Sequence, residues 1–214
     1  MSCTVQAFSA PTVGTVPSVA LMSWRTERAK RLDELVRAHS HMSGTGPGRR
    51  WQTRQVVYAM ILRLAGEFQG YSRDLHDLAA EVFATQLGDG APAVEGAVRI
   101  LATRNRKLDT GNAQPGALGN DFGALDLQLW PELQAAYSSR ASDWNKNLEA
   151  LNTARNGIAH DDSSKLAKVE SDGYRIAQVA TFTRLRKSMD QLAHAMDDVV
   201  AGHCADLFSI ARPW

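Results

Sequence analysis

Cysteine is nearly absent from this chain of 214 residues, which contains only Cys3 and Cys204. Two cysteines so far apart support neither a disulfide framework nor a cysteine-based zinc site, so we expect a reducing, cytoplasmic setting. Long apolar runs are missing as well, and none reaches the roughly 18 residues of a membrane-spanning helix. Residues 1–21 lack the basic start and compact apolar stretch of a signal peptide. We therefore expect no membrane partner.

Net charge is also small. The formal value is +1, and hydrophobic residues make up 44% of the chain, which is ordinary for a globular protein. Because the net charge is so small, the protein has no long-range field that would attract nucleic acid. Any contact with nucleic acid must therefore depend on a local group of charges. Residues 1–21 contain Pro11, Gly14 and Pro17 and predict an irregular N-terminal arm. Residues 22–214 are enough for a single helical domain.

Apolar residues recur at helical spacing through most of the chain. Steps of three and four residues link the apolar positions from Val57 to Val82 and predict one long central helix of roughly nine turns. A second seam runs from Phe182 to His203. We expect an all-α helical bundle of five or six helices, two of them long. An Asp-Gly turn between short alternating runs predicts a small β-hairpin over residues 168–176.

The most informative stretch covers residues 148–162. Leu148, Leu151 and Ile158 lie on one stripe of a helix, and Arg155 falls in the middle of that stripe. A guanidinium cannot be deprotonated, and burying it unpaired would cost several kcal/mol. Arg155 must therefore meet a carboxylate or face a groove that binds an anion. Glu67, beside the central seam, is a candidate partner, although a solvated Glu67 is an equally good interpretation.

His160 follows Arg155 by five residues, about 140° around a helix, so the two side chains of one chain do not stack. Asn156 precedes His160 by four residues and shares its face. An arginine, an amide and a titratable imidazole form a sensible set for handling a phosphodiester. Asp161 follows at once, where Gly157 already weakens the helix.

Arg155-Asn156-Gly157-Ile158-Ala159-His160 resembles the R-x(4–6)-H motif of the HEPN superfamily, in which a polar residue often follows the arginine. The resemblance extends over residues 51–208. It implies metal-independent cleavage of single-stranded or looped RNA by its own 2′-OH, without a cofactor or metal. Arg155 would stabilise the phosphoryl charge, and His160 would act as general acid or base. Asn156 would orient the histidine or hydrogen-bond the sugar-phosphate. In the second shell, Glu67 would lie near the motif and Asp161 would act on the imidazole.

The same resemblance implies a homodimer in which two motifs face each other, so that Arg155 of one copy acts with His160 of the other. The two long apolar seams independently favour a self-complementary dimer. Members of the superfamily often serve as toxins or antiphage effectors with an antitoxin or regulatory partner. Some are modified on a tyrosine shortly after the histidine, whereas Asp161-Asp162-Ser163 follows here.

Two further segments bear on RNA binding. The densest basic patch is predicted at the end of a helix beginning near Pro92, and we expect an RNA backbone to follow its residues Arg99, Arg104, Arg106 and Lys107. A solvated helix face is the simpler interpretation. Residues 110–123, rich in glycine and asparagine, predict a long loop that borders the motif.

Three functions are compatible with these patterns. The first is an endoribonuclease of the HEPN type. The second is a non-catalytic HEPN module that binds nucleotide or RNA, in which the same residues serve only as anion ligands. The third is a helical dimeric scaffold in which Arg155 pairs with Glu67 and His160 is a solvated residue at a helix end.

Overall fold

The computed structural model describes residues 16–42 and 49–214, apart from the side chains of residues 49–52. This part of the chain is helical throughout and has no strand, which confirms the all-α prediction. The predicted arm falls mainly on residues outside the described part. The elements are α1 Val19–Ser23, the π-helical turn η1 Trp24–Arg28, α2 Ala29–Met42, α3 Arg49–Gly88, α4 Pro92–Thr103, α5 Lys107–Thr110, α6 Pro115–Gly123, α7 Leu129–Tyr137, α8 Ser139–Ala159, α9 Ser163–Ser171 and α10 Val179–Phe208.

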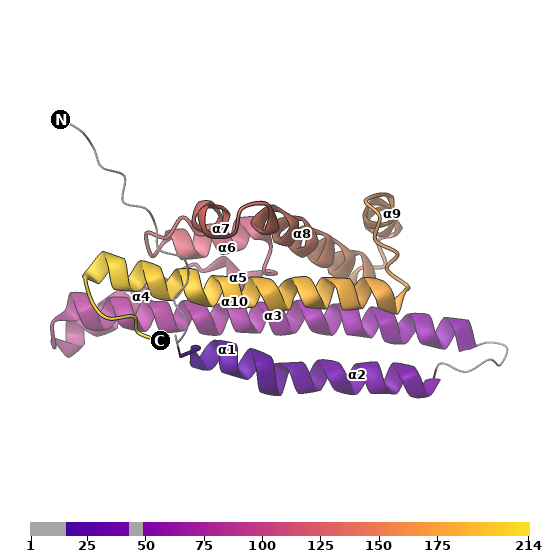
Figure 1. The fold of residues 1–214 in the computed structure, drawn as a ribbon, viewed down its shortest axis with the longest axis horizontal. Helices are drawn as coiled ribbons and strands as arrows, with labels where there is room; N and C mark the ends of the chain where they lie inside the picture. Colours follow the sequence, from indigo (N-terminus) through magenta and orange to yellow (C-terminus); the bar gives the residue numbers. More distant parts are fainter. Residues whose placement is uncertain (1–15, 43–48) are drawn as a thin grey trace.

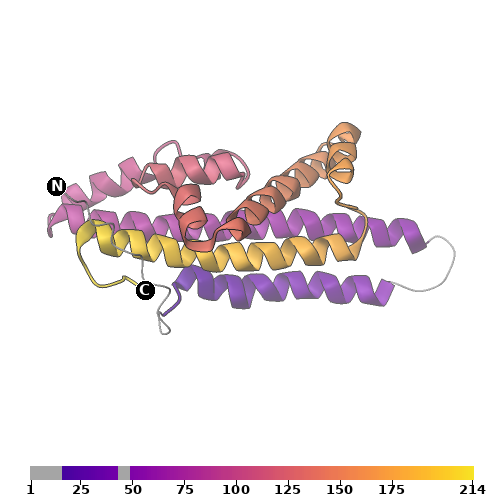
Figure 2. The same cartoon turned by 45° about the horizontal axis from the view of Figure 1, so that its top comes forward.

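The two long helices form the middle of the molecule. Helix α3 has 40 residues and α10 has 30, and they run side by side along the longest axis (Figure 1). Helices α1 and α2 lie along one side of this pair. Helices α5 to α8 lie along the other, with α9 at the far end of α8 (Figure 2). The prediction of two long helices is confirmed.

Helix α3 is the axis of the bundle because its apolar seam faces neighbours on several sides. Ile61, Leu64, Phe68, Tyr71 and Leu75 are all 0% exposed and belong to one continuous core. The seam passes through Gly66 and Gly70 without a break, as predicted. None of the helices in the described residues is long and apolar enough to cross a membrane.

The hairpin predicted over residues 168–176 is wrong. Helix α9 occupies most of this range, and Asp162 caps its start by accepting hydrogen bonds from the backbone N–H groups of Ser164 and Lys165. The Asp-Gly pair ends the helix instead of turning a hairpin. Gly173 has a φ of +88°, and the N–H of Tyr174 reaches back to the carbonyl of Val169. This is a Schellman termination, which uses the same glycine as a hairpin turn would.

The segment 110–123 is only partly the loop that we predicted. Residues Pro115–Gly123 form α6, with Pro115 in the first turn, so the irregular part is short. Helix α8 begins at Ser139, directly after the short helix α7. Because of such short helices, the described residues form more helices than the five or six that the sequence predicted.

Helix α2 is held to α3 by ion pairs around one buried carboxylate. The side chain of Glu67 is 4% exposed and pairs with Arg28 at 2.8 Å, Arg63 at 2.7 Å and Arg31 at 3.3 Å. Arg28 also pairs with Asp74 at 2.7 Å. Burial alone would raise the pKa of Glu67. The arginines outweigh this effect and lower the pKa, and the hydrogen bond from Arg28 contributes most among them. Removing one partner from a buried pair is strongly destabilising.

Gly70 provides the space for this contact, which gives a first prediction. A Cβ at position 70 would collide with the guanidinium of Arg28, and moving Arg28 would break its ion pairs with Glu67 and Asp74. We expect Gly70→Ala to lower the free energy of unfolding by about 1 kcal/mol despite its better helix propensity. Urea denaturation measures this difference.

Gly66 on the same helix is the matched control. It is exposed, and a Cβ there would meet nothing within 4 Å. Gly66→Ala should therefore raise the free energy of unfolding by about 0.5–1 kcal/mol through helix propensity alone. Equal effects of the two substitutions would contradict the role given to Arg28.

Candidate functional site

Helix α8 carries the motif and ends within it. Ala159 is its last residue, and His160 already leaves the helical conformation with a φ of −111°. His160 is exposed, whereas Arg155 and Asn156 are half-buried. The predicted end of the helix at the histidine is therefore confirmed. The structure places the three side chains on the last turn and a half of one helix.

Arg155 has an amide partner instead of an acid. Its Nη1 donates to Oδ1 of Asn156 at 3.0 Å. Among the described residues no carboxylate oxygen lies within the 4.0 Å of an ion pair with its guanidinium. A guanidinium has five N–H donors in a fixed plane, so most of its donors stay available for another acceptor. A half-buried cation with free donors is suited to an anion with several oxygens.

A third polar side chain, which the sequence did not single out, completes this arrangement. Nδ2 of Asn112 donates to Oδ1 of Asn156 at 2.7 Å. The same oxygen thus accepts from Asn112 and Arg155 and uses both of its lone pairs. These two bonds fix the orientation of the Asn156 amide. Its Nδ2 donates to none of the described residues and is available to a ligand. The predicted approach of the segment 110–123 to the motif is confirmed at Asn112.

Buried amides fix the short loop that contains Asn112. Asn152 is 2% exposed, and its Nδ2 donates to the carbonyl of Ala113 at 2.9 Å. Gln69 on α3 donates to the carbonyls of Leu108 at 2.8 Å and Gly111 at 2.6 Å. The loop is therefore tied to both α3 and α8. Asn112 is presented to Asn156 by a framework that is already ordered.

An open groove adjoins the loop. It has a volume of about 580 Å³ and is lined by Lys107, Thr110, Gly111, Asn112, Gln114, Gly116, Ala117 and Asn120. The exposed ammonium of Lys107 is the only formal charge among these lining residues. A groove with one cation and several amides next to Arg155 suits a backbone of negative charges with polar bases.

Gly157 determines how the chain leaves the site. A Cβ at this position would collide with the side chain of Leu166, so the glycine allows α9 to pack directly on α8. Asp161 then turns the chain with a left-handed φ of +51°. Asp162 is occupied as the cap of α9 and pairs with Lys165 at 2.9 Å, which lowers its pKa. Asp161 is exposed, and its side chain forms no hydrogen bond or ion pair with a described residue. It is therefore the acid next to His160 that remains available.

Glu67 does not serve as the partner of Arg155. Its carboxylate is taken up by Arg28, Arg31 and Arg63, and Asp74 also pairs with Arg28. The sequence placed Glu67 beside the seam of α3, but it gave no indication that Arg28 of η1 and Arg31 of α2 would reach it first. The version of the scaffold hypothesis in which Arg155 pairs with Glu67 is therefore wrong.

Two of the four basic residues expected along an RNA backbone are neutralised by acids. Arg99 lies between α4 and α3, where it pairs with Glu81 at 2.5 Å and with Glu95 at 3.2 Å. Arg106 is 8% exposed and pairs with Asp77 and Asp109. Arg104 and Lys107 are exposed and form no ion pair with a described residue. Of the four, Lys107 is the one that lines the groove beside Asn112.

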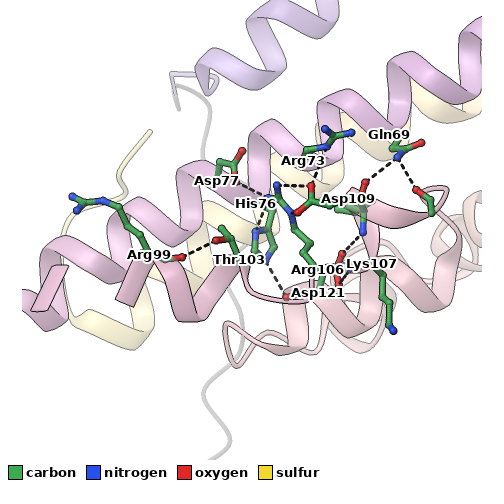
Figure 3. Close-up of polar contacts among 12 residues, drawn as sticks. Gln69, Arg73, His76, Asp77, Arg99, Thr103, Arg106, Lys107, Asp109 and Asp121 are labelled. Carbon is green, nitrogen blue, oxygen red and sulfur yellow. Dashed lines mark hydrogen bonds and ion pairs between the residues drawn. The ribbon is translucent and has the colours of Figure 1, made fainter. Parts of the chain in front are cut away.

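Arg106 is the buried centre of a polar cluster that joins α5 and α6 to α3 (Figure 3), in which Asp77 and Asp109 are exposed. Its guanidinium pairs with Asp77 at 2.5 Å and Asp109 at 2.9 Å, and it lies 3.3 Å from Nδ1 of His76. Since an arginine only donates, Nδ1 of His76 accepts, and its Nε2–H donates to the carbonyl of Asp121 at 3.1 Å. Arg106 is thus a structural residue and is not available to RNA.

The carboxylate of Asp121 closes this cluster. Its two oxygens accept from the backbone N–H groups of Lys107 and Leu108, both at 2.8 Å (Figure 3). It therefore caps the first turn of α5 and fixes where Lys107 and the following loop begin. The cluster fixes the start of the segment that lines the groove, and its own side chains do not line it.

Comparisons with known proteins identify no relative: no family model, no curated protein and no solved structure matches this chain. In the part of the chain that the structure describes, no group of three or more histidine, cysteine, aspartate or glutamate side chains is placed to hold a metal ion. The chemistry of the site must therefore be argued from its own geometry.

The buried histidine gives a prediction about pH. His76 is 0% exposed, and desolvation lowers its pKa. The unfolded chain, with an ordinary histidine pKa of about 6.5, binds this proton more readily than the folded protein does. The stability contributed by neutral His76 is therefore present above about pH 6.5 and is lost as the pH falls below it. The free energy of unfolding, measured by urea denaturation between pH 7.5 and 5, should decline on acidification.

His76→Gln keeps a side-chain donor for the Asp121 carbonyl but cannot titrate. It should flatten part of this decline, whereas His160→Gln, at an exposed position, should leave the slope as in the wild type. The same slope in all three proteins would show that His76 does not control it.

Proposed function

We propose that this protein is a metal-independent endoribonuclease of the HEPN type that cleaves single-stranded or looped RNA. The observation that carries the proposal is Arg155, a half-buried guanidinium that has no carboxylate partner among the described residues. It is oriented by the amide chain Asn156–Asn112 and lies five residues from the exposed imidazole of His160. An unpaired cation of this kind, next to an open polar groove, is an anion site.

The proposed reaction uses the substrate's own nucleophile. The 2′-OH attacks the adjacent phosphorus and the bond to the 5′-oxygen breaks, which leaves a 2′,3′-cyclic phosphate and a 5′-OH. A base takes the proton of the 2′-OH and an acid supplies one to the leaving oxygen, so His160 acts in one of these roles. Arg155 stabilises the charge that grows on the phosphoryl oxygens. The free Nδ2 of Asn156 contacts the sugar-phosphate.

RNA with a freely turning backbone fits this chemistry best, because attack must occur in line with the leaving oxygen. Lys107 and the amides of the groove beside Asn112 are placed to bind the neighbouring nucleotides. Of the basic residues considered for backbone contact, Lys107 and Arg104 remain in this proposal, and Arg99 and Arg106 do not.

A homodimer supplies the second half of the site in this proposal. His160 lies at the exposed end of α8, and Arg155 is half-buried on the turn before it, about 140° away around the helix. If two copies face each other, Arg155 of one copy acts with His160 of the other. A toxin or antiphage role with a regulatory partner would follow from the motif resemblance alone, and growth of cells expressing wild type or His160→Ala tests it.

The second candidate is a module that binds RNA or nucleotide without cleaving it. It is favoured by the same free donors of Arg155 and by the groove, and it needs no participation of His160. The two candidates therefore differ in whether the histidine matters beyond binding.

The decisive assay incubates purified protein with single-stranded RNA in EDTA. Wild type should cleave, and the products should carry 2′,3′-cyclic phosphate ends. Arg155→Ala and His160→Ala should each reduce the rate by about 10²–10⁴-fold, because each removes charge stabilisation or proton transfer in the transition state. Both variants should keep the wild-type circular dichroism, since neither side chain is part of the buried core.

Arg37→Ala and His41→Ala on α2 are matched controls, since both residues are exposed and lie outside the site. They should cleave at the wild-type rate. Cleavage that requires added metal would reject the mechanism. RNA binding without cleavage, lost in Arg155→Ala and retained in His160→Ala, would establish the binding module instead.

Mixing the two inactive variants tests the shared site. In a heterodimer of Arg155→Ala with His160→Ala, one of the two composite sites keeps both functional residues. Since about half of the dimers in an equilibrated mixture are heterodimers, roughly a quarter of the wild-type rate should return. The measurement is RNA cleavage after the variants have been mixed and re-equilibrated. No recovery, with dimers verified by sedimentation, would place both residues of each site on one chain.

A further inference from the structure

A second cleft, of about 830 Å³, lies at the opposite end of α8 from Arg155. Its walls come from η1, the first turns of α8, α10 and the C-terminal segment. Arg140, in the first turn of α8, lines it and precedes Arg155 by 15 residues, about 22 Å along the helix. The volume is in the range of small-molecule sites. The cleft is thus separate from the proposed RNA site.

Four aromatic rings line the cleft, and the protein satisfies the polar atom of each. Nε1 of Trp24 donates to Asp190 at 3.0 Å, Nε1 of Trp144 to Gln191 at 3.1 Å, and Nε1 of Trp214 to the carbonyl of Asp197 at 3.2 Å. The hydroxyl of Tyr137 donates to Asp198 at 3.1 Å. Trp24 and Trp144 are only 3% and 4% exposed, so the aromatic surface open to a ligand comes from the half-buried rings of Tyr137 and Trp214. With their donors occupied, these two rings offer mainly apolar surface in a fixed orientation.

The charges of the cleft are unevenly matched. Arg186 pairs with Asp33 at 2.6 Å and Arg212 with Asp198 at 2.7 Å, so both cations are compensated. Arg25 and Arg140 also line the cleft and are exposed. Neither forms an ion pair with a described residue. Two cations at the edge of an aromatic wall are therefore left without an anion.

The acids that face the cleft form no ion pair with Arg25 or Arg140, and the charge of Arg25 only opposes the rise that burial causes in the pKa of Asp197. Asp197 is 4% exposed and accepts both the backbone N–H and the hydroxyl of Ser18. Asp190 accepts from Trp24, and burial raises its pKa.

From this arrangement we propose that the cleft binds a small organic anion with a planar, largely apolar ring system. The half-buried rings of Tyr137 and Trp214 hold the body of the ligand, with Trp24 and Trp144 packed behind them. Arg25 and Arg140 bind its carboxylate, sulfonate or phosphate group. The proposal is independent of the RNA chemistry at the other end of α8.

The test titrates the full-length protein with 8-anilinonaphthalene-1-sulfonate, an aromatic sulfonate with a planar naphthalene ring system, and follows its fluorescence and the stoichiometry by calorimetry. We expect one site per chain. Arg25→Gln and Arg140→Gln should each weaken binding by about tenfold, as the loss of one charged hydrogen-bonding group predicts. Arg37→Gln, at an exposed position outside the cleft, should bind as the wild type does, and so should Arg155→Ala.

Two comparison probes make the outcome decisive. N-phenyl-1-naphthylamine has the same rings without the sulfonate and should bind at least tenfold more weakly. Inorganic phosphate alone should not displace the sulfonate at comparable concentration. Equal binding of the neutral probe, indifference to both arginine substitutions, or full displacement by phosphate would each overturn the proposal. Binding that is retained in a protein without ribonuclease activity would still support it.

Discussion

Desolvation of polar groups on the central helix α3 is the constraint that determines how the other helices are arranged around it. Within residues 67–77 of an otherwise apolar seam, polar side chains point toward different neighbours, and each needs a partner. Glu67 receives Arg28 of η1 and Arg31 of α2, and the hydroxyl of Tyr71 donates to the carbonyl of Ala193 on α10 at 2.6 Å. His76 and Asp77 receive Arg106 and the segment that leads to α6.

The candidate site depends on the same region. Gln69 of α3 holds the backbone at Leu108 and Gly111, and Asn152 of α8 holds it at Ala113, so the loop between them is fixed from both sides. Asn112 is thereby brought to Asn156, which in turn orients Arg155. The acids near α3 are occupied by other arginines. Arg155 is left with amides, and this is the physical basis for regarding it as an anion ligand.

The sequence predicted those features that depend on periodicity. The long seam from Val57 to Val82, the second seam that became α10 and the end of α8 at His160 are all present, because a buried helical face requires regular spacing. Asp172-Gly173 was misjudged because a glycine with positive φ serves a hairpin turn and a helix terminus equally well.

Features that depend on which helices meet could not be predicted. Arg99 pairs with Glu81 across 18 residues of sequence, and Arg106 with Asp77 across 29, because α4 folds back along α3. No local pattern distinguishes an arginine that will find such an acid from one that will not. Asn112 was missed for the same reason. Its contact with Asn156 spans 44 residues, and only its place in a polar loop hinted at it.

Helix α8 links two surfaces that differ in character. One end contributes Arg140 and Trp144 to an aromatic cleft, and the other presents Arg155 and His160. A continuous helix of 21 residues behaves as a stiff rod of about 30 Å, so its two ends move together. The cleft and the motif therefore share one stiff backbone, and the 15 residues between Arg140 and Arg155 hold them about 22 Å apart.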